Sequence, residues 1–585
     1  MIQLLKNLKK QEWALAALSV AFVVFQVWLE LTMPDYMSRI TVLVKTPGSQ
    51  MADILAAGGK MLLCALGSLC ASALTAVCAA RIATGFSGTL RSRLFSAVQS
   101  FSMEEIGRFS TASLITRSTN DVTQVQMVIV LGLQVMVKAP VMAAWAIAKI
   151  AGKQWQWTLS TAAAVAVLLV VVGVCLLLVT PRFKQMQRLT DDVNRVTREN
   201  LTGLSVVRAY NAEEYQEEKF ARANEALTAT QLFNQRTLAF MMPSIQLVMS
   251  GLSLAVYWIG AILIQRAGMG SKLTLFSDMM VFSQYAMQVV MSFMLLVMIF
   301  MILPRASVAA GRINEVLNTR PTIRDGERTQ GEPGQAGRVE FRDVSFRYPD
   351  AGEDVLEHIS FTANAGETVA IIGATGCGKS TLINLIPRFY DATGGQVLVD
   401  GADVREYRQS ALRDRIGYVS QKATLFTGSI RSNVDYGDNG APPAGEKAVR
   451  AAVETAQAAE FVDNMEGGLE AFVAQGGGNL SGGQKQRVSI ARAIARKPEI
   501  LIFDDSFSAL DYKTDRVLRR ALDKACAGTT RIIVAQRIGT IRDADRILVL
   551  DQGRVVGMGT HGELMETCPV YQQIALSQLS KEELA

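Results

Sequence analysis

Residues 368–381 read TVAIIGATGCGKST, and this stretch decides the fold of the C-terminal part of the chain. An apolar run, TVAII, leads into a GxxxxGK[ST] loop and then into a helical pattern, LINLI. Three glycines let backbone N–H groups turn inward around a phosphate: Gly373, Gly376 and Gly378. Lys379 reaches the terminal phosphates and Ser380 offers a hydroxyl to Mg²⁺. This order of strand, phosphate loop and helix predicts an α/β P-loop domain that binds a nucleotide.

Other short motifs surround this loop in the sequence. The apolar run EILIFD at residues 499–504 ends in Asp504, the carboxylate expected to hold Mg²⁺ through water after a buried strand. Between the two strands lies NLSGGQKQR at residues 479–487, and SALD follows at residues 508–511. Gln421 comes directly after the strand-like stretch IGYVS. Together these motifs identify a protein family more specifically than a phosphate loop alone does.

The first 320 residues differ in character from the rest of the chain. They hold 28 lysines and arginines against 17 carboxylates, net +11, whereas the remainder holds 31 against 36, net −5. Six apolar stretches reach the roughly 20 residues needed to cross a bilayer. These predicted spans are residues 13–33, 57–80, 127–150, 157–180, 238–265 and 279–303. The pattern excludes a soluble, a disordered or a secreted disulfide-linked protein, and it attributes the positive excess to membrane topology rather than to nucleic-acid binding.

The distribution of positive charge predicts the topology and the domain boundaries. Two long connections, residues 81–121 and 182–236, are rich in Lys and Arg, so the positive-inside rule puts both loops and both termini in the cytoplasm. The first apolar segment is too long for a signal peptide and lacks a small-residue cleavage site, so it is interpreted as an uncleaved span. We expect an all-α transmembrane domain at 1–318, a Pro/Gly/charge-rich linker at 319–337 and the nucleotide-binding domain at 338–585.

In two predicted spans a charge interrupts the apolar run, Glu30 in the first and Lys138 in the third, and the sixth span is rich in methionine. Intramembrane charges are costly, so a functional role is one hypothesis for Glu30 and Lys138. The structural alternative is that Glu30 snorkels or caps near the outer face and that Lys138 contacts backbone ahead of Pro140. The sixth span carries Met279, Met280, Met287, Met291, Met294, Met298 and Met301. Thioethers adapt to varied apolar shapes, although packing against a helix or lipid is an equal alternative.

Taken in order, these motifs resemble those of the ABC transporters, in which LSGGQ is the signature sequence. Six spans with two long cytoplasmic loops and one following nucleotide-binding domain are similar to an exporter-type half-transporter, two of which associate with swapped helices. The loop texts at residues 104–122 and 199–220 resemble that family's intracellular loops, whose short coupling helices rest on the nucleotide-binding domains. The resemblance implies ATP and Mg²⁺ as cofactors. The implied surroundings are a bacterial cytoplasmic membrane, a second half-transporter and a hydrophobic or amphipathic substrate, with no nucleic acid.

The resemblance also assigns roles to individual residues. The residues implied to contact ATP are Tyr348, Gly373, Thr375, Gly376, Cys377, Gly378, Lys379, Ser380, Thr381, Gln421 and Asp504. Tyr348 would stack on adenine, and the implied Mg²⁺ ligands are Ser380, Gln421 and Asp504. The signature would close over ATP bound to the opposite subunit: Leu480, Ser481, Gly482, Gly483 and Gln484. The D-loop is identified as Ser508, Ala509, Leu510 and Asp511.

Two departures from the family pattern fall at the catalytic positions. Asp505 stands where the family has a glutamate that polarises the attacking water, so its carboxylate sits about 1.5 Å further back. Misplacement on that scale costs about a hundredfold in rate. Gln536 in IIVAQRIGT replaces the family's switch histidine. A neutral amide hydrogen-bonds a γ-phosphate but carries neither a proton nor a positive charge.

Smaller departures lie nearby. Gln475 replaces a glutamate in the loop before the signature, which puts the usual contact of that loop with the intracellular loops in doubt. Cys377 stands where many relatives have Ser or Ala, and it acts either as a small filler or as a site sensitive to thiol reagents. The two histidines of the chain, His358 and His561, lie in other motifs.

Together, Asp505 and Gln536 predict a site that binds ATP but hydrolyses it slowly. The intact signature would serve the partner's site, so we expect a heterodimer similar to the bacterial multidrug exporters, with this chain as the degenerate-site subunit. The expected activity is ATP hydrolysis coupled to export of drugs or lipids. A homodimer with two slow sites is the alternative. An ATP-gated channel or regulator, and an importer of metal chelates built on the exporter scaffold, also remain open.

Overall fold

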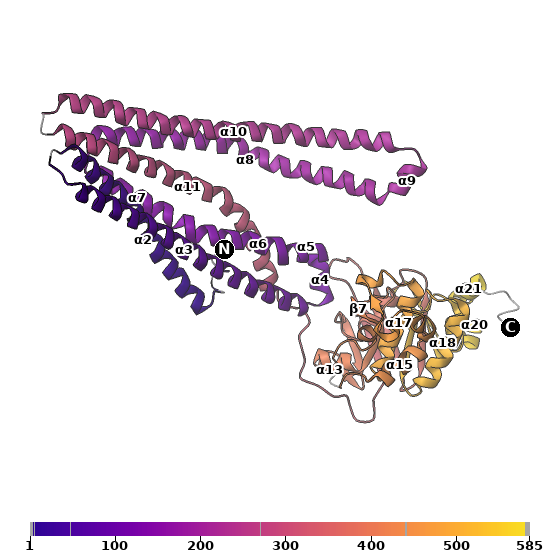
Figure 1. Ribbon diagram of the computed structural model, residues 1–585. Coiled ribbons are helices and arrows are strands. Elements are labelled where there is room, and N and C mark those ends of the chain that lie inside the picture. The colour runs from indigo at the N-terminus through magenta and orange to yellow at the C-terminus, as the bar shows by residue number, and fades with distance from the viewer. Residues whose placement is uncertain are drawn as a thin grey trace. The chain divides into compact units, whose positions relative to one another are not determined.

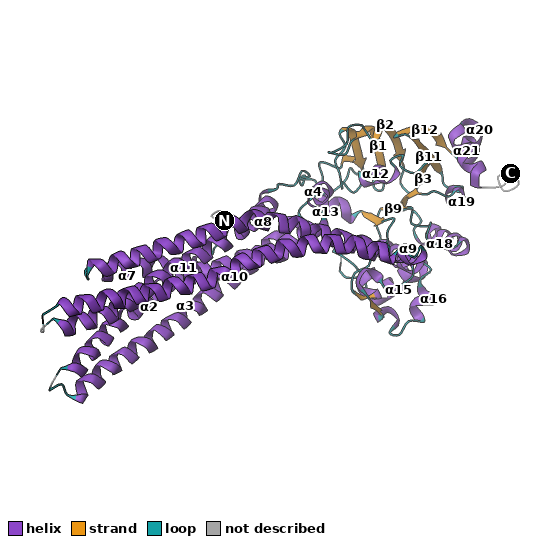
Figure 2. Cartoon of the chain, turned by 90° about the horizontal axis from the view of Figure 1, so that it is seen from above, coloured by secondary structure: helices purple, strands orange, loops and turns teal. Residues whose placement is uncertain are grey.

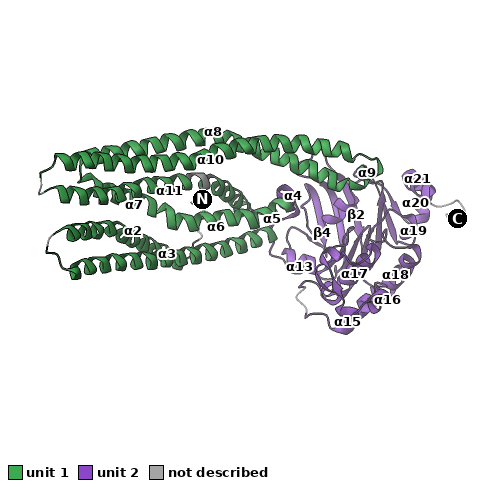
Figure 3. Ribbon diagram, turned by 45° about the horizontal axis from the view of Figure 1, so that its top comes forward, with its two compact units in different colours: residues 1–99, 112–319 green, residues 100–111, 320–585 purple. Residues whose placement is uncertain are grey.

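The computed structural model describes residues 8–46, 48–268, 271–438 and 442–578, together with Leu4 and Lys6. The chain divides into two compact units (Figure 3). Unit 1 comprises Met1–Gln99 and Ala112–Thr319, and unit 2 comprises Ser100–Thr111 and Arg320–Ala585. The predicted fold class, an all-α transmembrane domain followed by an α/β nucleotide-binding domain, is confirmed. A short piece of the first long loop groups with unit 2.

Among the described residues, six helices are long and apolar enough to cross a membrane. They are α2 (Lys10–Lys45), α3 (Met51–Gln99), the run from α5 to α7 (Thr111–Ala151), α8 (Trp155–Thr202), α10 (Glu213–Arg266) and α11 (Lys272–Asn318) (Figure 1). Each contains one predicted span and continues past it. Since about 20 residues cross the hydrocarbon core, the 48 residues of α8 and the 54 of α10 extend well beyond a bilayer.

The third spanning helix contains two π-helical stretches, which the sequence did not indicate. Its parts are α5 (Thr111–Thr116), η1 (Arg117–Asp121), α6 (Val122–Leu131), η2 (Gly132–Met136) and α7 (Lys138–Ala151). π-Helical turns inside α-helices are rare and frequently mark functional sites. Both stretches pack against α11.

The two charges in the spans form an ion pair with each other. Lys138 Nζ lies 2.9 Å from Glu30 Oε1, and the same oxygen accepts hydrogen bonds from Gln26 Nε2 at 2.8 Å and Ser68 Oγ at 3.2 Å. The structural alternative drawn from the sequence, with Glu30 snorkelling and Lys138 on backbone, is therefore wrong in its contacts. Pairing with a charge on another helix satisfies both groups away from water and joins α2, α3 and α7.

Helices α8 and α10 form a long hairpin that closes at α9 (Leu204–Ala209) and runs side by side in Figures 1 and 2. Within unit 1 the hairpin packs on α11 and α7 rather than on α2 and α3. Around α9 it leaves large side chains exposed: Leu201 by 67%, Val206 by 59%, Tyr210 by 79% and Tyr215 by 64%. These side chains form a cluster of large exposed groups in a loop that the sequence places in water.

Unit 2 is built on a six-stranded sheet in the order β12-β11-β3-β10-β9-β6. The strands are β3 (Thr368–Gly373), β6 (Ile416–Val419), β9 (Ile500–Asp504), β10 (Thr530–Val534), β11 (Arg546–Asp551) and β12 (Arg554–Gly559). All pair in parallel except β11 with β12. The carboxyl ends of parallel strands meet at one edge, so the loops after β3, β6, β9 and β10 come together there.

A smaller antiparallel sheet packs on one face of the large sheet, and helices cover the other. Its strands, in the order β2-β1-β4-β5, are β1 (Val339–Phe346), β2 (Leu356–Ala363), β4 (Gly394–Val399) and β5 (Ala402–Asp403). Figure 2 labels β1 and β2. Alternation along β3 sends Val369 and Ile371 into the core shared with the small sheet. Ala370 and Ile372 point into the core that contains the buried face of α17 (Gly482–Ala495).

The segment expected as a linker lies along unit 2. Gly326 N donates to Tyr407 O at 2.9 Å, and Glu332 N donates to Asp400 O at 2.8 Å. The buried guanidinium of Arg388 donates to the carbonyl oxygen of Arg324 at 2.9 Å, besides its ion pair with Asp391. These bonds fasten the first residues after α11 to the small sheet and its surroundings.

Candidate nucleotide-binding site

A cavity of about 340 Å³ opens at the carboxyl edge of the six-stranded sheet. It is lined by Tyr348, Val355, Thr375, Gly376, Gly378, Lys379, Ser380, Thr381, Gln421, Asp504, Asp505, Val534 and Gln536. The structure thus brings together most of the residues that the sequence implied for ATP contact, along with both catalytic-position departures. Gly373 and Cys377 lie behind the lining. Val355 and Val534 carried no signal in the sequence, because a single valine beside a strand has many other uses.

Glycines give the phosphate loop its path. Gly376 and Gly378 adopt φ of +88° and +98°, in the left-handed region that favours glycine. A Cβ at Gly378 would also stand 2.8 Å from Leu356 Cδ2. A Cβ at Gly373, where β3 ends, would stand 2.0 Å from Leu550 O. The loop can therefore hold its backbone close to β11 and turn its amides toward the cavity.

Lys379 is the charged group in the loop. Its side chain is buried, and Nζ donates to Gly373 O at 2.9 Å and to Ala374 O at 2.7 Å. Within the described ranges, no carboxylate lies within 4.0 Å of Nζ. A buried ammonium that has only neutral acceptors lacks its counter-charge, and the phosphates of a nucleotide fit that need.

Cys377 lies under the same loop. Its side chain is buried, and Sγ is 3.7 Å from Lys379 Nζ. A Cβ at Gly373 would come within 2.7 Å of this sulfur, so the thiol occupies the space that the missing side chain leaves. This position agrees with the interpretation of Cys377 as a small filler.

A hydroxyl and a carboxylate lie side by side where Mg²⁺ is expected. Ser380 Oγ donates to Asp504 Oδ1 at 2.8 Å. Burial raises the pKa of Asp504, the hydrogen bond from Ser380 lowers it, and the neighbouring Asp505 raises it again. Mg²⁺ prefers oxygen ligands such as the Ser380 hydroxyl and the Asp504 carboxylate. A bound cation would also offset the negative charge of Asp504, which burial disfavours. The chemistry of these two residues therefore fits the ion.

Asp505 is held by amide groups rather than by a histidine. Its Oδ2 accepts from Gln536 Nε2 at 2.8 Å and from Gln421 Nε2 at 3.3 Å. Burial raises the pKa of Asp505, while hydrogen bonds from Gln421 and Ser508 oppose this effect. Its backbone φ is +47°. Neither amide can take up a proton, so the cluster contains acceptors and donors for binding but lacks an imidazole to assist hydrolysis.

Gln536 has a second set of contacts that the sequence did not reveal. Gln578, at the end of α21 (Pro569–Gln578), donates from Nε2 to Gln536 O at 2.7 Å and accepts from Ile538 N at 2.9 Å. A glutamine 42 residues away carries no motif, so only the fold could identify it.

Tyr348 borders the cavity from the end of β1. Its hydroxyl lies 3.0 Å from Thr381 Oγ1, and its ring makes edge contacts with Phe346 and Tyr390 at centroid distances of 4.9 and 5.3 Å. The half-buried ring is thus fixed by aromatic neighbours at the mouth of the cavity, as an adenine platform requires.

The signature and the D-loop lie outside this cavity. Ser481 caps α17, accepting from Gln484 N at 3.3 Å, and Gln484 Oε1 accepts in return from Ser481 N at 2.9 Å. Asp511 caps α18 (Tyr512–Ala525), and Ser508 Oγ donates to Asp505 O at 2.8 Å. Gln475 begins the short helix η4 (Gln475–Gly477). Of the described residues that line the cavity, none belongs to the signature or the D-loop.

Two family models match the chain. The ABC transporter model matches residues 356–508, and the ABC transporter transmembrane region matches residues 16–304. An uncharacterized ABC transporter ATP-binding protein of Mycobacterium tuberculosis is 39% identical over 528 residues, 90% of this chain and 88% of that protein. An ATP-dependent lipid A-core flippase of Aromatoleum aromaticum is 33% identical over 503 residues, 86% of this chain and 82% of the flippase.

A solved structure gives a similar result. The chain superposes on a bacterial Atm1-family ABC exporter with ATP bound, with a TM-score of 0.77 and 25% sequence identity. The alignment covers 95% of this chain and 97% of the other. The similarity therefore extends over the helical part and the α/β part alike.

Proposed function

The chain belongs to the ABC transporter family, with the transmembrane region and the ATP-binding domain in one polypeptide, and we propose that it is one half of a heterodimeric exporter. In this proposal it lies in the cytoplasmic membrane of a bacterium with both termini in the cytoplasm. It uses ATP to export hydrophobic or amphipathic compounds. Two similar proteins, a lipid A-core flippase and an Atm1-family exporter, support the direction of transport.

The observation that carries the proposal is the arrangement around Asp505. Gln536 and Gln421 donate to one oxygen of a carboxylate that is one methylene shorter than the family's glutamate. General-base catalysis needs a well-placed base and a partner that can accept or stabilise a proton. Asp505 is a poorly placed base and Gln536 cannot accept a proton. Lys379, Ser380 and Asp504, in contrast, retain the groups that bind ATP and Mg²⁺. We infer a site that holds ATP and hydrolyses it slowly.

The second half of the proposal concerns the partner. The signature of this chain is intact and lies outside its own cavity, so a second chain must bring ATP to it. A homodimer would contain two impaired sites, which makes a weak motor. A different half-transporter with the family's glutamate and histidine would give one competent site, over which residues 480–484 of this chain would close.

Each residue of the site has a defined task in this mechanism. When bound, Mg²⁺·ATP supplies the phosphate charge that draws two nucleotide-binding domains together. Tyr348 stacks on the base, Lys379 binds the terminal phosphates, and Ser380 with Asp504 holds the cation. Gln536 donates to the γ-phosphate without exchanging a proton. The loops at residues 81–121 and 182–236 transmit the closure to the spans.

The substrate class rests on the apolar character of unit 1. A small apolar cavity lies between α6 and α11, lined by residues that include Met136 and Met298. Both are partly exposed, as is Met291. The side chain of Met301 lies outside the described residues. Flexible thioethers beside an apolar hollow favour an amphipathic drug or a lipid over a sugar or an ion.

The test restores the two catalytic positions in the full chain. In nanodiscs that hold two copies of the chain, so that each intact signature can close over the other copy's site, we expect Asp505→Glu together with Gln536→His to raise ATP turnover about a hundredfold, because the base regains its reach and the switch regains its imidazole. Turnover is measured as phosphate release at saturating Mg²⁺·ATP. Adding Lys379→Ala to the restored variant should return the rate to the background, which assigns the gain to this site. Wild-type turnover already equal to that of the restored variant would contradict a degenerate site.

A further inference from the structure

We propose that Gln578, on the C-terminal helix α21, is a positioning residue for the switch position of this ATP site. Its side-chain amide bridges two backbone groups of the switch loop, the carbonyl oxygen of Gln536 and the N–H of Ile538. The inference rests on the proposed function of the site and adds the element that holds the γ-phosphate donor in place.

The geometry fixes the orientation of the amide without ambiguity. Nε2 donates to Gln536 O at 2.7 Å, and Oε1 accepts from Ile538 N at 2.9 Å. If Oε1 and Nε2 of Gln578 were exchanged, Oε1 would face the carbonyl oxygen of Gln536 and Nε2 would face the N–H of Ile538, so neither hydrogen bond could form. The two hydrogen bonds reach Gln536 and Ile538, the residues on either side of Arg537. Together they resist rotation of the peptide that carries Gln536.

The loop needs such a restraint because its own elements are short. It connects β10 (Thr530–Val534) to α19 (Ile538–Ile541), a helix of four residues. Gln536 and Arg537 are both exposed. The side chain of Gln536 reaches Asp505 at 2.8 Å from this exposed turn. The position of its amide therefore depends on how firmly the turn is held.

Helix α21 is well anchored and gives Gln578 a firm base. Tyr571 and Ala575 are fully buried in the core shared with α17 and β11. The hydroxyl of Tyr571 lies 2.7 Å from His561 Nδ1, and Gln572 Nε2 donates to Met565 O at 2.7 Å. The turn is thus tied to a helix that is fixed by its own packing, and a hydrogen-bonded series runs from Gln578 through Gln536 to Asp505 and Gln421.

The consequence is retention of ATP. A donor that is held in place loses little conformational freedom when it binds the γ-phosphate, whereas a mobile donor must be ordered at each binding event. Because both of these hydrogen bonds go to backbone atoms of the loop, their effect does not depend on the side chain at position 536. It should act on Gln536 in this chain and equally on a histidine introduced there.

The experiment measures release of a fluorescent ATP analogue from the full chain in nanodiscs with Mg²⁺. We expect Gln578→Ala to speed release about tenfold, the effect of one or two ordinary hydrogen bonds. Gln578→Glu keeps the side-chain length and the acceptor oxygen but cannot donate to the carbonyl oxygen of Gln536. This variant should therefore release the ATP analogue at least as fast as Gln578→Ala. Gln572→Ala removes a comparable bond from the same helix away from the loop, and its release rate should match the wild type. All variants should share one unfolding midpoint, since Gln578 is exposed.

A second measurement uses the Asp505→Glu, Gln536→His background. There Gln578→Ala should lower kcat, because the introduced histidine is held less firmly, and should raise the KM for ATP about tenfold, because ATP is released faster. Equal effects of the Gln578 and Gln572 variants, or no effect of Gln578→Ala on release, would overturn the inference. If Asp505→Glu with Gln536→His did not raise turnover, that result would count against the degenerate site. The effect of Gln578→Ala on the release of the ATP analogue could still be interpreted.

Discussion

At the scale of the residue, Gly373 shows how little room the site leaves for change. It ends β3 directly beside Leu550 of β11, and its missing side chain makes space for the sulfur of Cys377. A Cβ added at Gly376, three residues later, would meet no atom within 4 Å, so this glycine is distinguished by its positive φ. The two glycines are thus required for different reasons, one by packing and one by backbone conformation.

This difference predicts different outcomes for two alanine variants. Gly373→Ala should lower the unfolding midpoint of the chain sharply and abolish its shift by Mg²⁺·ATP, because a Cβ 2.0 Å from Leu550 O forces β3 and β11 apart. Gly376→Ala should cost about 1–3 kcal/mol, the strain of a left-handed backbone on a residue with a side chain. Differential scanning fluorimetry with and without nucleotide measures both. A milder effect of Gly373→Ala than of Gly376→Ala would refute the packing argument.

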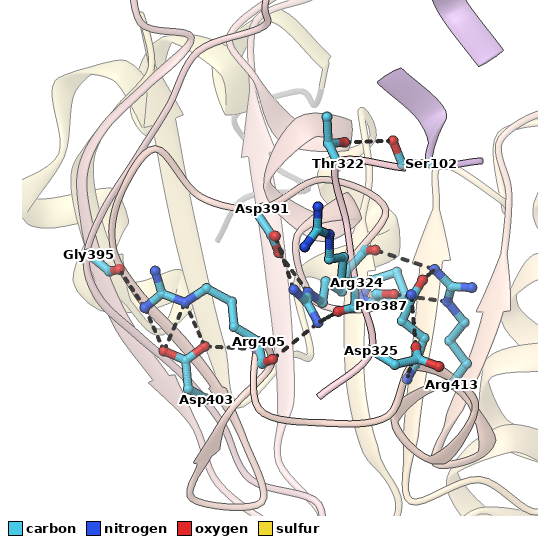
Figure 4. Close-up of polar contacts among 12 residues, drawn as sticks. Ser102, Thr322, Arg324, Asp325, Pro387, Asp391, Gly395, Asp403, Arg405 and Arg413 are labelled. Atoms are coloured by element: carbon cyan, nitrogen blue, oxygen red, sulfur yellow. Dashed lines mark hydrogen bonds and ion pairs between the residues drawn. The ribbon is translucent and has the colours of Figure 1, made fainter. Parts of the chain in front are cut away.

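At the scale of the element, the short helix α4 (Met103–Phe109) is held to the segment that follows α11. Glu105 is buried, and its Oε1 accepts from Thr322 N at 3.0 Å while Oε2 accepts from Ser102 N at 2.8 Å. Figure 4 shows the hydroxyls of Ser102 and Thr322 facing each other, 3.2 Å apart. One carboxylate therefore both caps α4 and ties it to residues 320–322 within unit 2. The family resemblance expected a coupling helix in this loop.

We predict that Glu105→Ala releases this tie. Amide exchange in residues 100–111 and 320–324 should become at least tenfold faster, because hydrogen bonds to a charged group contribute about 1.5–3 kcal/mol each. Hydrogen–deuterium exchange of the full chain measures the change. Glu104→Ala, one residue earlier on the same helix, is the matched control and should leave exchange at Thr322 as in the wild type.

The same tie has a predicted pH dependence. Burial opposes the charged form of Glu105, but the hydrogen bonds from Ser102 and Thr322 outweigh it and lower the pKa. A lowered pKa in the folded state stabilises the fold above the ordinary glutamate value of about 4.3, and this contribution is lost as the pH falls through the lowered pKa. Protection at Thr322, corrected for intrinsic exchange, should therefore persist at pH 5 and decline in more acidic solution. Unchanged protection down to pH 2 would contradict the role of the carboxylate.

At the scale of the whole molecule, the surface around α9 has the features of an interface. Tyr210 and Tyr215 are exposed by 79% and 64% at the end of the α8–α10 hairpin, where the topology predicts water rather than lipid. Large aromatic side chains are enriched in the centres of protein–protein interfaces. The hairpin thus offers the contact that the proposed second half-transporter would bury.

We predict that Tyr210→Ser together with Tyr215→Ser weakens association with that partner. Because both rings are exposed in the isolated chain, the unfolding midpoint of the chain purified alone should stay the same. The fraction that co-purifies with the partner, and ATP turnover of the pair, should fall at least tenfold, since each buried aromatic anchor contributes about 2 kcal/mol or more. Full association of the double variant would place the interface elsewhere.

The architecture and most residues that line the candidate nucleotide site follow from local patterns in the sequence. Six apolar stretches, a GxxxxGK[ST] loop after an apolar strand and an acidic strand end are local patterns, and hydrophobic length and glycine placement act within a few residues of the chain. For that reason six spanning helices, an α/β domain and a cavity that contains Lys379, Ser380, Asp504 and Asp505 could be predicted without coordinates.

The contacts between residues far apart in the chain follow from the packing of the fold and could not be predicted from the sequence. It paired Glu30 with Lys138, 108 residues apart, tied Glu105 to Thr322 across 217 residues, and brought Gln578 to the switch loop. Each of these contacts depends on a hydrogen bond or ion pair between side chains and groups on different elements, whose directions follow from packing and leave no periodic trace in the sequence. The same holds for the amide pair on Asp505, because parallel strands must first assemble before the loops after β6, β9 and β10 share one edge.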